Sequence, residues 1–122
     1  MNNRLTKRQR LLHSRDFSQV FNQPALRVSS PQLLILAQPN EQGLARMGLV
    51  ISRKNVGCAV ARNRIKRLCR EAFRQRADDF ATIDIVILAR NGLDKLDNSA
   101  VTLLLNSLFD KLCQKGATQA HA

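Results

Sequence analysis

One stretch, residues 60–74, constrains the fold and the function of this chain more than any other. Its sequence, VARNRIKRLCREAFR, holds a single acid, Glu71, among many arginines and lysines. Apolar residues recur in it at the spacing of a helix that packs along one side, and these residues are Ile65, Leu68, Cys69, Ala72 and Phe73. We therefore expect an amphipathic helix from about residue 60 to residue 76.

The side of this helix opposite the apolar residues is basic. A helical wheel clusters four residues there and places basic residues on both flanks: Asn63, Arg67, Arg70 and Arg74, flanked by Arg62 and Lys66 on one side and by Arg64 on the other. Like charges one turn apart repel each other by roughly a few tenths of a kcal/mol per pair. Solvated helix faces normally mix both signs, so a face of one sign favours a polyanionic ligand over a merely solvated surface.

The net charge of the chain is concentrated in the same way. Of the formal +11, residues 1–15 contribute +5 and residues 53–76 contribute +8, whereas residues 16–52 contribute 0 and residues 77–122 contribute −2. Concentrated positive charge indicates a nucleic acid or an anionic membrane as the partner. A membrane is disfavoured because no apolar stretch approaches ~18 residues and no apolar signal segment follows the basic start.

The remaining periodicities predict one α+β domain over residues 1–122, with a small mixed sheet of about four strands and helices packed on one side. Phe17, Val20 and Phe21 predict a helix over 14–22 with Ser14 as its N-cap. Residues 32–38 and 45–52 read as strands that form an antiparallel hairpin. Residues 83–89 predict a buried strand, and a helix from residue 98 carries a clear core stripe: Val101, Leu104, Leu105, Leu108, Phe109 and Leu112.

Both ends of the chain are expected to lie outside the packed domain. Residues 1–12 are basic and polar, which allows a mobile segment, and residues 116–122 predict a disordered tail.

The cysteines favour a reducing compartment, so we expect a cytoplasmic protein. Cys58, Cys69 and Cys113 are odd in number and lack a CxxC spacing, and the last two fall on apolar helix faces, as buried reduced thiols do. His13 and His121 are too isolated in the sequence to complete a zinc site with them.

The sequence offers no catalytic group of its own. A metal-dependent nuclease needs a cluster of carboxylates, and the only local acid group, Asp78, Asp79 and Asp84, reads as a polar connection between a helix and a strand. His13 has no visible acid–base partner. We therefore expect no catalytic residue and no protein-bound metal.

Residues 46–73, RMGLVISRKNVGCAVARNRIKRLCREAF, resemble the protein subunit of bacterial ribonuclease P. The signature of that family is Arg-Asn-Arg, then Ile-Lys-Arg and, one turn later, Arg-Glu-x-Phe, which stand here at 62–64, 65–67 and 70–73. The resemblance extends to Asp-Phe-x-x-Val-Phe at 16–21 and to Ala-Arg-Asn-Gly at 89–92, and covers roughly residues 4–113.

The resemblance implies a ribonucleoprotein endonuclease in which this chain is the accessory subunit. The partners would be a large catalytic RNA, which holds the magnesium ions, and precursor tRNA, whose 5′ leader is removed. The family fold contains a left-handed β-α-β crossover. Family roles imply that the basic helix docks on the RNA subunit through Arg62, Asn63, Arg64, Lys66, Arg67, Arg70 and Arg74. They also imply a leader cleft formed by Phe17, Phe21, Leu36, Arg46, Arg53, Lys54 and Arg90.

Two questions stay open at the level of the sequence. Phe17 and Phe21 either stack on leader bases or fill the core, because two Phe at i and i+4 are common in cores. Many relatives carry an aromatic near the position of Leu36, and this chain has no Tyr or Trp, so stacking would be weaker here. A small ribosomal protein would share the charge and size, and a major-groove DNA-binding module could use a similar helix, although no paired helix precedes it.

Overall fold

The computed structural model describes residues 7–11 and 13–117. Short 3-10 turns at Lys7–Gln9, Ala77–Asp79 and Leu93–Lys95 and a π-helical turn at Cys113–Ala117 accompany the main elements. Within the described residues these elements are, in chain order, α1 (Ser14–Asn22), β1 (Leu26–Ser29), β2 (Leu33–Pro39), β3 (Arg46–Val50), α2 (Ala59–Arg76), β4 (Ile83–Ala89) and α3 (Asn98–Leu112). The α+β class and the mixed sheet of four strands are thereby confirmed.

The strands lie in the order β1-β2-β4-β3. β4 pairs antiparallel with β2 and parallel with β3. The predicted hairpin between β2 and β3 is therefore wrong, because β4 lies between them. The physical reason is burial, because six of the seven β4 side chains are buried, as expected for a central strand. The short turn after β2 does not by itself require β2 and β3 to pair with each other. The prediction also missed β1, which is only four residues long and pairs antiparallel with β2.

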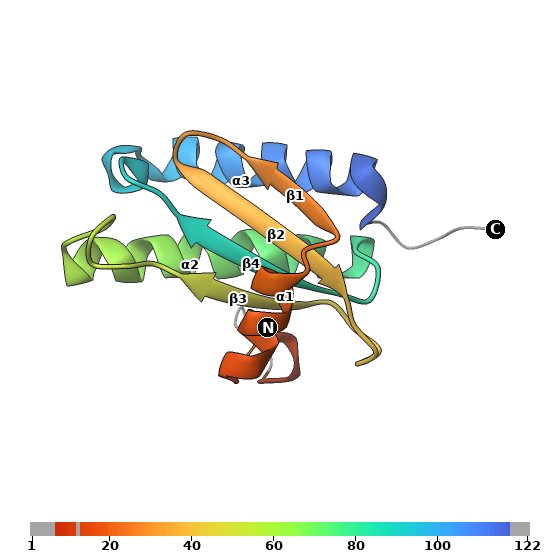
Figure 1. The fold of residues 1–122 in the computed structure, drawn as a ribbon. Helices are drawn as coiled ribbons and strands as arrows, with labels where there is room; N and C mark the ends of the chain where they lie inside the picture. The colour runs from red at the N-terminus through yellow and green to blue at the C-terminus, as the bar shows by residue number, and fades with distance from the viewer. Residues whose placement is uncertain (1–6, 12, 118–122) are drawn as a thin grey trace.

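β3, α2 and β4 form the left-handed crossover that the family resemblance implies. In Figure 1 the parallel strands β3 and β4 point the same way, β4 lies above β3, and α2 passes behind the sheet. A right-handed connection would pass in front of the sheet in this view. The consequence is that α2 lies along the rear of β3, at the edge of the sheet.

The main core lies between the sheet and the two long helices. Ile65 and Phe73 of α2 and Leu105 and Phe109 of α3 are fully buried, as their periodicity predicts. Phe80 stacks on Phe73 at 5.8 Å between ring centroids and meets Phe109 edge-on at 5.4 Å. This packing turns the basic side of α2 away from the protein.

The helix α1 lies on the opposite face of the sheet (Figure 1). Its Val20 packs with Leu36 of β2 and Val86 of β4 in a second, smaller core cluster that also includes Leu11. The expectation of helices on one side thus holds for α2 and α3, whereas α1 covers part of the other face. His13, not Ser14, occupies the N-cap position, and its side chain makes no capping hydrogen bond.

The segment before α1 lies against β3 where it is described. Arg10 forms a parallel bridge with Met47, the Leu11 N–H donates to the Met47 carbonyl at 3.0 Å, and the Leu11 side chain is buried. The rest of the segment expected to be mobile, residues 1–6 and 12, lies outside the described residues. Of the tail expected to be disordered, Gly116 and Ala117 complete the π-helical turn, and 118–122 lie outside the described part.

The three cysteines are free and differ in environment. Burial raises the pKa of the Cys69 thiol to about 12 and also raises that of Cys113. Cys58 is exposed at the start of α2, where the nearby backbone N–H groups of Ala61 and Val60 favour the thiolate and lower its pKa. Only the predicted burial of Cys69 is complete, since Cys113 is half-buried.

We expect iodoacetamide to alkylate Cys58 first, Cys113 more slowly and Cys69 only after unfolding. The thiolate is the reactive form, and its fraction grows as pH rises toward the pKa, so Cys58 should react at a lower pH than Cys113. Peptide mass spectrometry after timed alkylation measures the order. Equal rates for Cys58 and Cys69 in the folded protein would contradict the buried position of Cys69.

Candidate nucleic-acid interface

The outward face of α2 carries the residues that the sequence singled out. Four of them make no hydrogen bond or ion pair with the described part of the chain: Asn63, Lys66, Arg67 and Arg70. Asn63 and Arg67 are exposed, and Lys66 and Arg70 are half-buried. The buried Ile65, Cys69 and Phe73 hold the opposite face of the same helix against the sheet. Helical packing therefore presents these four polar groups to solvent from one rigid element.

Three other predicted docking residues are used within the protein. Arg62 donates to the carbonyls of Val56 and Gly57, both at 3.0 Å, and so holds the loop that precedes α2. Arg74 forms an ion pair with Glu71 at 2.8 Å. These contacts order the two guanidinium groups on the protein surface and compete with any external ligand.

Arg64 makes more hydrogen bonds within the protein than Arg62 or Arg74 does. Its guanidinium donates to the Asn98 side chain at 2.7 Å and to the carbonyls of Asp94 and Leu96, both at 3.0 Å. These bonds join α2 to the segment that enters α3. Arg76 reinforces the same helix pair through an ion pair with Asp110 at 2.8 Å. The second arginine of the Arg-Asn-Arg motif thus holds α2 in place.

A second surface lies on the α1 side of the sheet. Leu34, Val50 and Leu88 stand half-buried beside the small core cluster. Phe21 is 41% exposed, and Phe17 is half-buried with its ring seated against Gly48, where an added Cβ would come within 2.5 Å of two ring atoms. Leu36 is only 6% exposed beneath α1, so its side chain is part of the core and is not available to a ligand in this structure.

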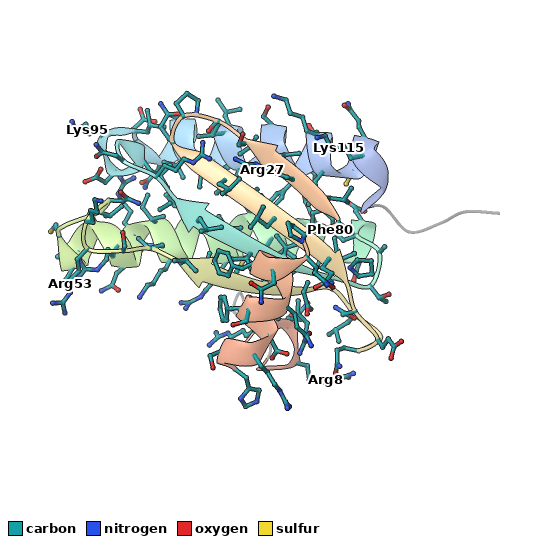
Figure 2. The ribbon with its side chains drawn as sticks, viewed as in Figure 1. Arg8, Arg27, Arg53, Phe80, Lys95 and Lys115 are labelled. Atoms are coloured by element: carbon teal, nitrogen blue, oxygen red, sulfur yellow. The ribbon has the colours of Figure 1, made fainter. Side chains whose placement is uncertain are left out.

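The four predicted basic residues of this second surface divide into two kinds. Arg53 and Lys54 are exposed in the loop after β3, and Figure 2 shows Arg53 at the outer end of the molecule, near the start of α2. Arg90 is half-buried and donates to the Ser30 carbonyl at 2.9 Å. Arg46 points into the protein instead. Of these four basic residues, only Arg53 and Lys54 have side chains that are free on the described surface.

The Arg46 side chain forms the main buried ion pair of the described structure. It donates from Nε and Nη2 to the two carboxylate oxygens of Asp84, both at 2.8 Å, and Asn40 adds a third hydrogen bond to Asp84 at 2.7 Å. Asp84 is 5% exposed. The hydrogen bonds to Asp84 raise the pKa of Arg46. Arg46 is therefore a structural residue, which the sequence did not reveal because its partner lies on β4, 38 positions away.

The three acidic residues that the sequence groups together, Asp78, Asp79 and Asp84, do not form a cluster in the structure. Asp78 and Asp79 are exposed in the turn after α2, the polar connection that was predicted, but Asp84 lies within β4. Among the described residues no group of three His, Cys, Asp or Glu side chains is placed to hold a metal ion. No helix in the described part is long and apolar enough to cross a membrane.

The pKa of Arg70, on the outward face of α2, is shifted by its surroundings. Burial, and then the charge of Arg10, lower the pKa of Arg70. The sequence places Arg10 in the basic N-terminal segment, but nothing local indicates that this segment pairs with β3 and brings Arg10 beside α2. The position of Arg10 depends on its pairing with Met47 of β3, a contact between segments far apart in the sequence.

Comparison with known proteins assigns the chain to a family. The family model described as Ribonuclease P matches residues 5–113. A ribonuclease P protein component of Marinobacter nauticus is 48% identical over 109 residues, which cover 89% of this chain and 82% of the relative. One of Photorhabdus laumondii is 48% identical over 105 residues, covering 86% of this chain and 87% of the relative.

Solved structures agree with the sequence relatives. The RNase P protein of Thermotoga maritima superimposes with a TM-score of 0.69 at 32% identity, covering 81% of this chain and 94% of that one. The RNase P protein of Staphylococcus aureus has the same fold, with a TM-score of 0.79 at 23% identity over 91% of this chain and 98% of that one. With the signature string on α2 and the match over residues 5–113, the chain belongs to the ribonuclease P protein family.

Proposed function

We propose that this chain docks on the catalytic RNA of ribonuclease P through α2 and receives the 5′ leader of precursor tRNA beside α1. Family membership makes the chain part of the ribonuclease P holoenzyme and gives it a role in tRNA 5′ processing. The observation that carries the docking role is the free polar face of Asn63, Lys66, Arg67 and Arg70. Arginine forks and an ammonium group at fixed spacing suit the phosphates of a folded RNA.

The leader would lie on the open half of the α1 face. Single strands of variable sequence are held by stacking surfaces and basic residues rather than by base-edge recognition. Phe21 offers an exposed ring there, Phe17 offers the edge of a partly covered one, and Arg53 and Lys54 supply free charge. Arg90 can contribute its remaining N–H groups, whereas Leu36 and Arg46 support the surface from beneath.

We place the chemistry in the RNA subunit. The Asp84 carboxylate is bonded to Arg46 and Asn40, and Asp78 and Asp79 point outward from one turn, so none of these acids is set up to activate a water molecule. Magnesium ions would be bound by the RNA, and the protein would contribute binding. A cytoplasmic location accords with the three free cysteines.

Reconstitution tests this function directly. The full chain is mixed with a bacterial ribonuclease P RNA and precursor tRNA at a low magnesium concentration, at which the RNA alone is poorly active. We expect cleavage at the leader junction that depends on the chain. If the chain binds the RNA tightly yet leaves cleavage unchanged, the alternative of a structural RNA-binding protein, such as a small ribosomal protein, becomes the better reading.

Phe17→Ala and Phe21→Ala should each reduce the preference for precursor over mature tRNA, since base–aromatic stacking contributes ~1–3 kcal/mol per base. Phe21→Ala should do so with little loss of stability because its ring is 41% exposed. Phe17→Ala should also destabilise the fold, because its ring packs against Gly48. The affinities of both tRNA forms and a urea titration separate the two effects. Unchanged discrimination by a folded variant would assign that ring to packing alone.

A further inference from the structure

Gly48 lies in the middle of β3, where a glycine weakens the strand and calls for a packing reason. Its φ is not positive, so the backbone conformation does not require a glycine. The space beside it does. An added Cβ would lie 2.5 Å from both Cε1 and Cζ of Phe17 and 3.1 Å from the Cβ of Leu11. The missing side chain is therefore what admits the Phe17 ring to the surface of β3.

The groups around this glycine are held by other contacts. Leu11 is buried, and its N–H donates to a carbonyl of β3 at 3.0 Å. The helix α1 is held by Val20, which is fully buried, and by the attraction between Asp16 and Arg46 at 3.7 Å. A methyl group added to the strand would therefore displace the Phe17 ring rather than the backbone on either side of it.

The position of this ring matters because it borders the open part of the sheet. Residues in register form two rows on the α1 face: Gly48, Val86 and Leu36 lie in the first, and Val50, Leu88 and Leu34 lie in the second. The first row is buried, whereas the second is half-buried and open. Phe17 packs against the same small core cluster as the second row does. Moving the ring off the first row would thus change the wall of the open row.

We propose that Gly48 is a positioning residue for leader binding, because the absence of a side chain there sets the place of the Phe17 ring beside the open row. That this ring serves the leader rests on the proposed function, whereas the seating of the ring on Gly48 does not. Gly48 is itself buried. A larger residue at this position would alter leader binding without removing any group that contacts RNA.

The first experiment uses the protein alone and needs no RNA. In wild type, NMR should show nuclear Overhauser contacts between the Gly48 Hα protons and the Phe17 ring, and Gly48→Ala should shift the ring signals of Phe17. Gly57→Ala is the matched control, because an added Cβ there would lie 3.6 Å from the Arg53 carbonyl oxygen, an ordinary contact. It should leave the Phe17 signals unchanged. Absent contacts in wild type, or an unshifted ring in Gly48→Ala, would overturn the inference.

The second experiment measures the affinities of the reconstituted holoenzyme for precursor and mature tRNA. Gly48→Ala should lower the preference for the precursor by about fivefold, near the lower end of what one stacked base contributes, and Gly57→Ala should not. Docking on the RNA subunit should stay unchanged at temperatures at which urea titration shows that both variants are folded. A merely structural role of Gly48 would lower stability but leave the preference of the folded variant intact, and that result would overturn the positioning role.

A double variant shows whether Gly48 acts through the ring. In a Phe17→Ala background, Gly48→Ala should cause no further loss of preference, because the ring that it displaces is gone. A further loss of the same size would show that Gly48 acts elsewhere and would overturn the inference. If Phe17→Ala alone keeps the full preference, the proposed leader role of this ring fails and the positioning role fails with it. The NMR comparison still decides whether Gly48 seats the ring.

Discussion

Replacing Arg46 by alanine is expected to lower the free energy of unfolding by about 3 kcal/mol, since breaking a buried ion pair leaves an uncompensated charge. The charge is that of Asp84, which is 5% exposed and, among the described residues, would keep one side-chain partner, Asn40. The variant would also lose the weaker attraction to Asp16, which lies 3.7 Å from Arg46 and ties α1 to the sheet. A loss of this size is a large part of the stability of a small domain.

Urea unfolding of Arg46→Ala beside Arg53→Ala measures this effect. Arg53 is exposed, and its loss should change stability by less than ~0.5 kcal/mol. The double variant Arg46→Ala with Asp84→Ala should be less destabilised than the sum of the single variants, because it removes both charges. Similar stabilities of the two arginine variants would show that the pair contributes little. Any defect of Arg46→Ala in leader binding should then be judged only at temperatures at which the variant is folded.

The sequence predicted helices and buried faces well because these depend on local periodicity. Residues of the apolar stripe of α2, such as Ile65 and Phe73, are buried as expected, and β4 matches its predicted bounds. Strand pairing depends on contacts between distant segments, and there the prediction failed. β4 lies between β2 and β3, and β1, with four residues, is too short to show an alternating pattern of apolar residues. The crossover handedness came from the family resemblance, not from any pattern of residues.

The candidate site shows the same division between local and long-range information. A helical wheel assigns a direction to each arginine of α2 but cannot show which of them has a partner. The wheel places Arg64 on one flank of the basic face without showing a partner, yet it bonds to Asp94, Leu96 and Asn98, which come 30 or more residues later. Leu36 and Arg46 were assigned to the leader on the strength of family roles, and the fold uses both in its interior.

The free residues of α2 lead to the second large effect. We expect Arg67→Ala combined with Arg70→Ala to weaken association with the RNA subunit by ~2–4 kcal/mol, because each arginine can make charge-assisted hydrogen bonds to phosphate. Neither side chain is among the buried residues of α2, and neither has a partner in the described structure, so the variant should keep its fold. The dependence of affinity on salt should also fall, since each lost phosphate contact releases roughly 0.7–0.9 fewer counterions.

A salt titration of RNA affinity distinguishes these specific contacts from the effect of net charge. The matched control is Arg27→Ala combined with Lys111→Ala, which also removes two exposed positive charges, from β1 and α3. Because exposed charges farther away than the Debye length of about 8–10 Å are largely screened, the control should weaken docking much less at physiological salt. If the two double variants lose equal affinity and equal salt dependence, the RNA responds to total charge and the α2 face is not the docking surface. A larger loss in the α2 variant alone places the RNA on that face.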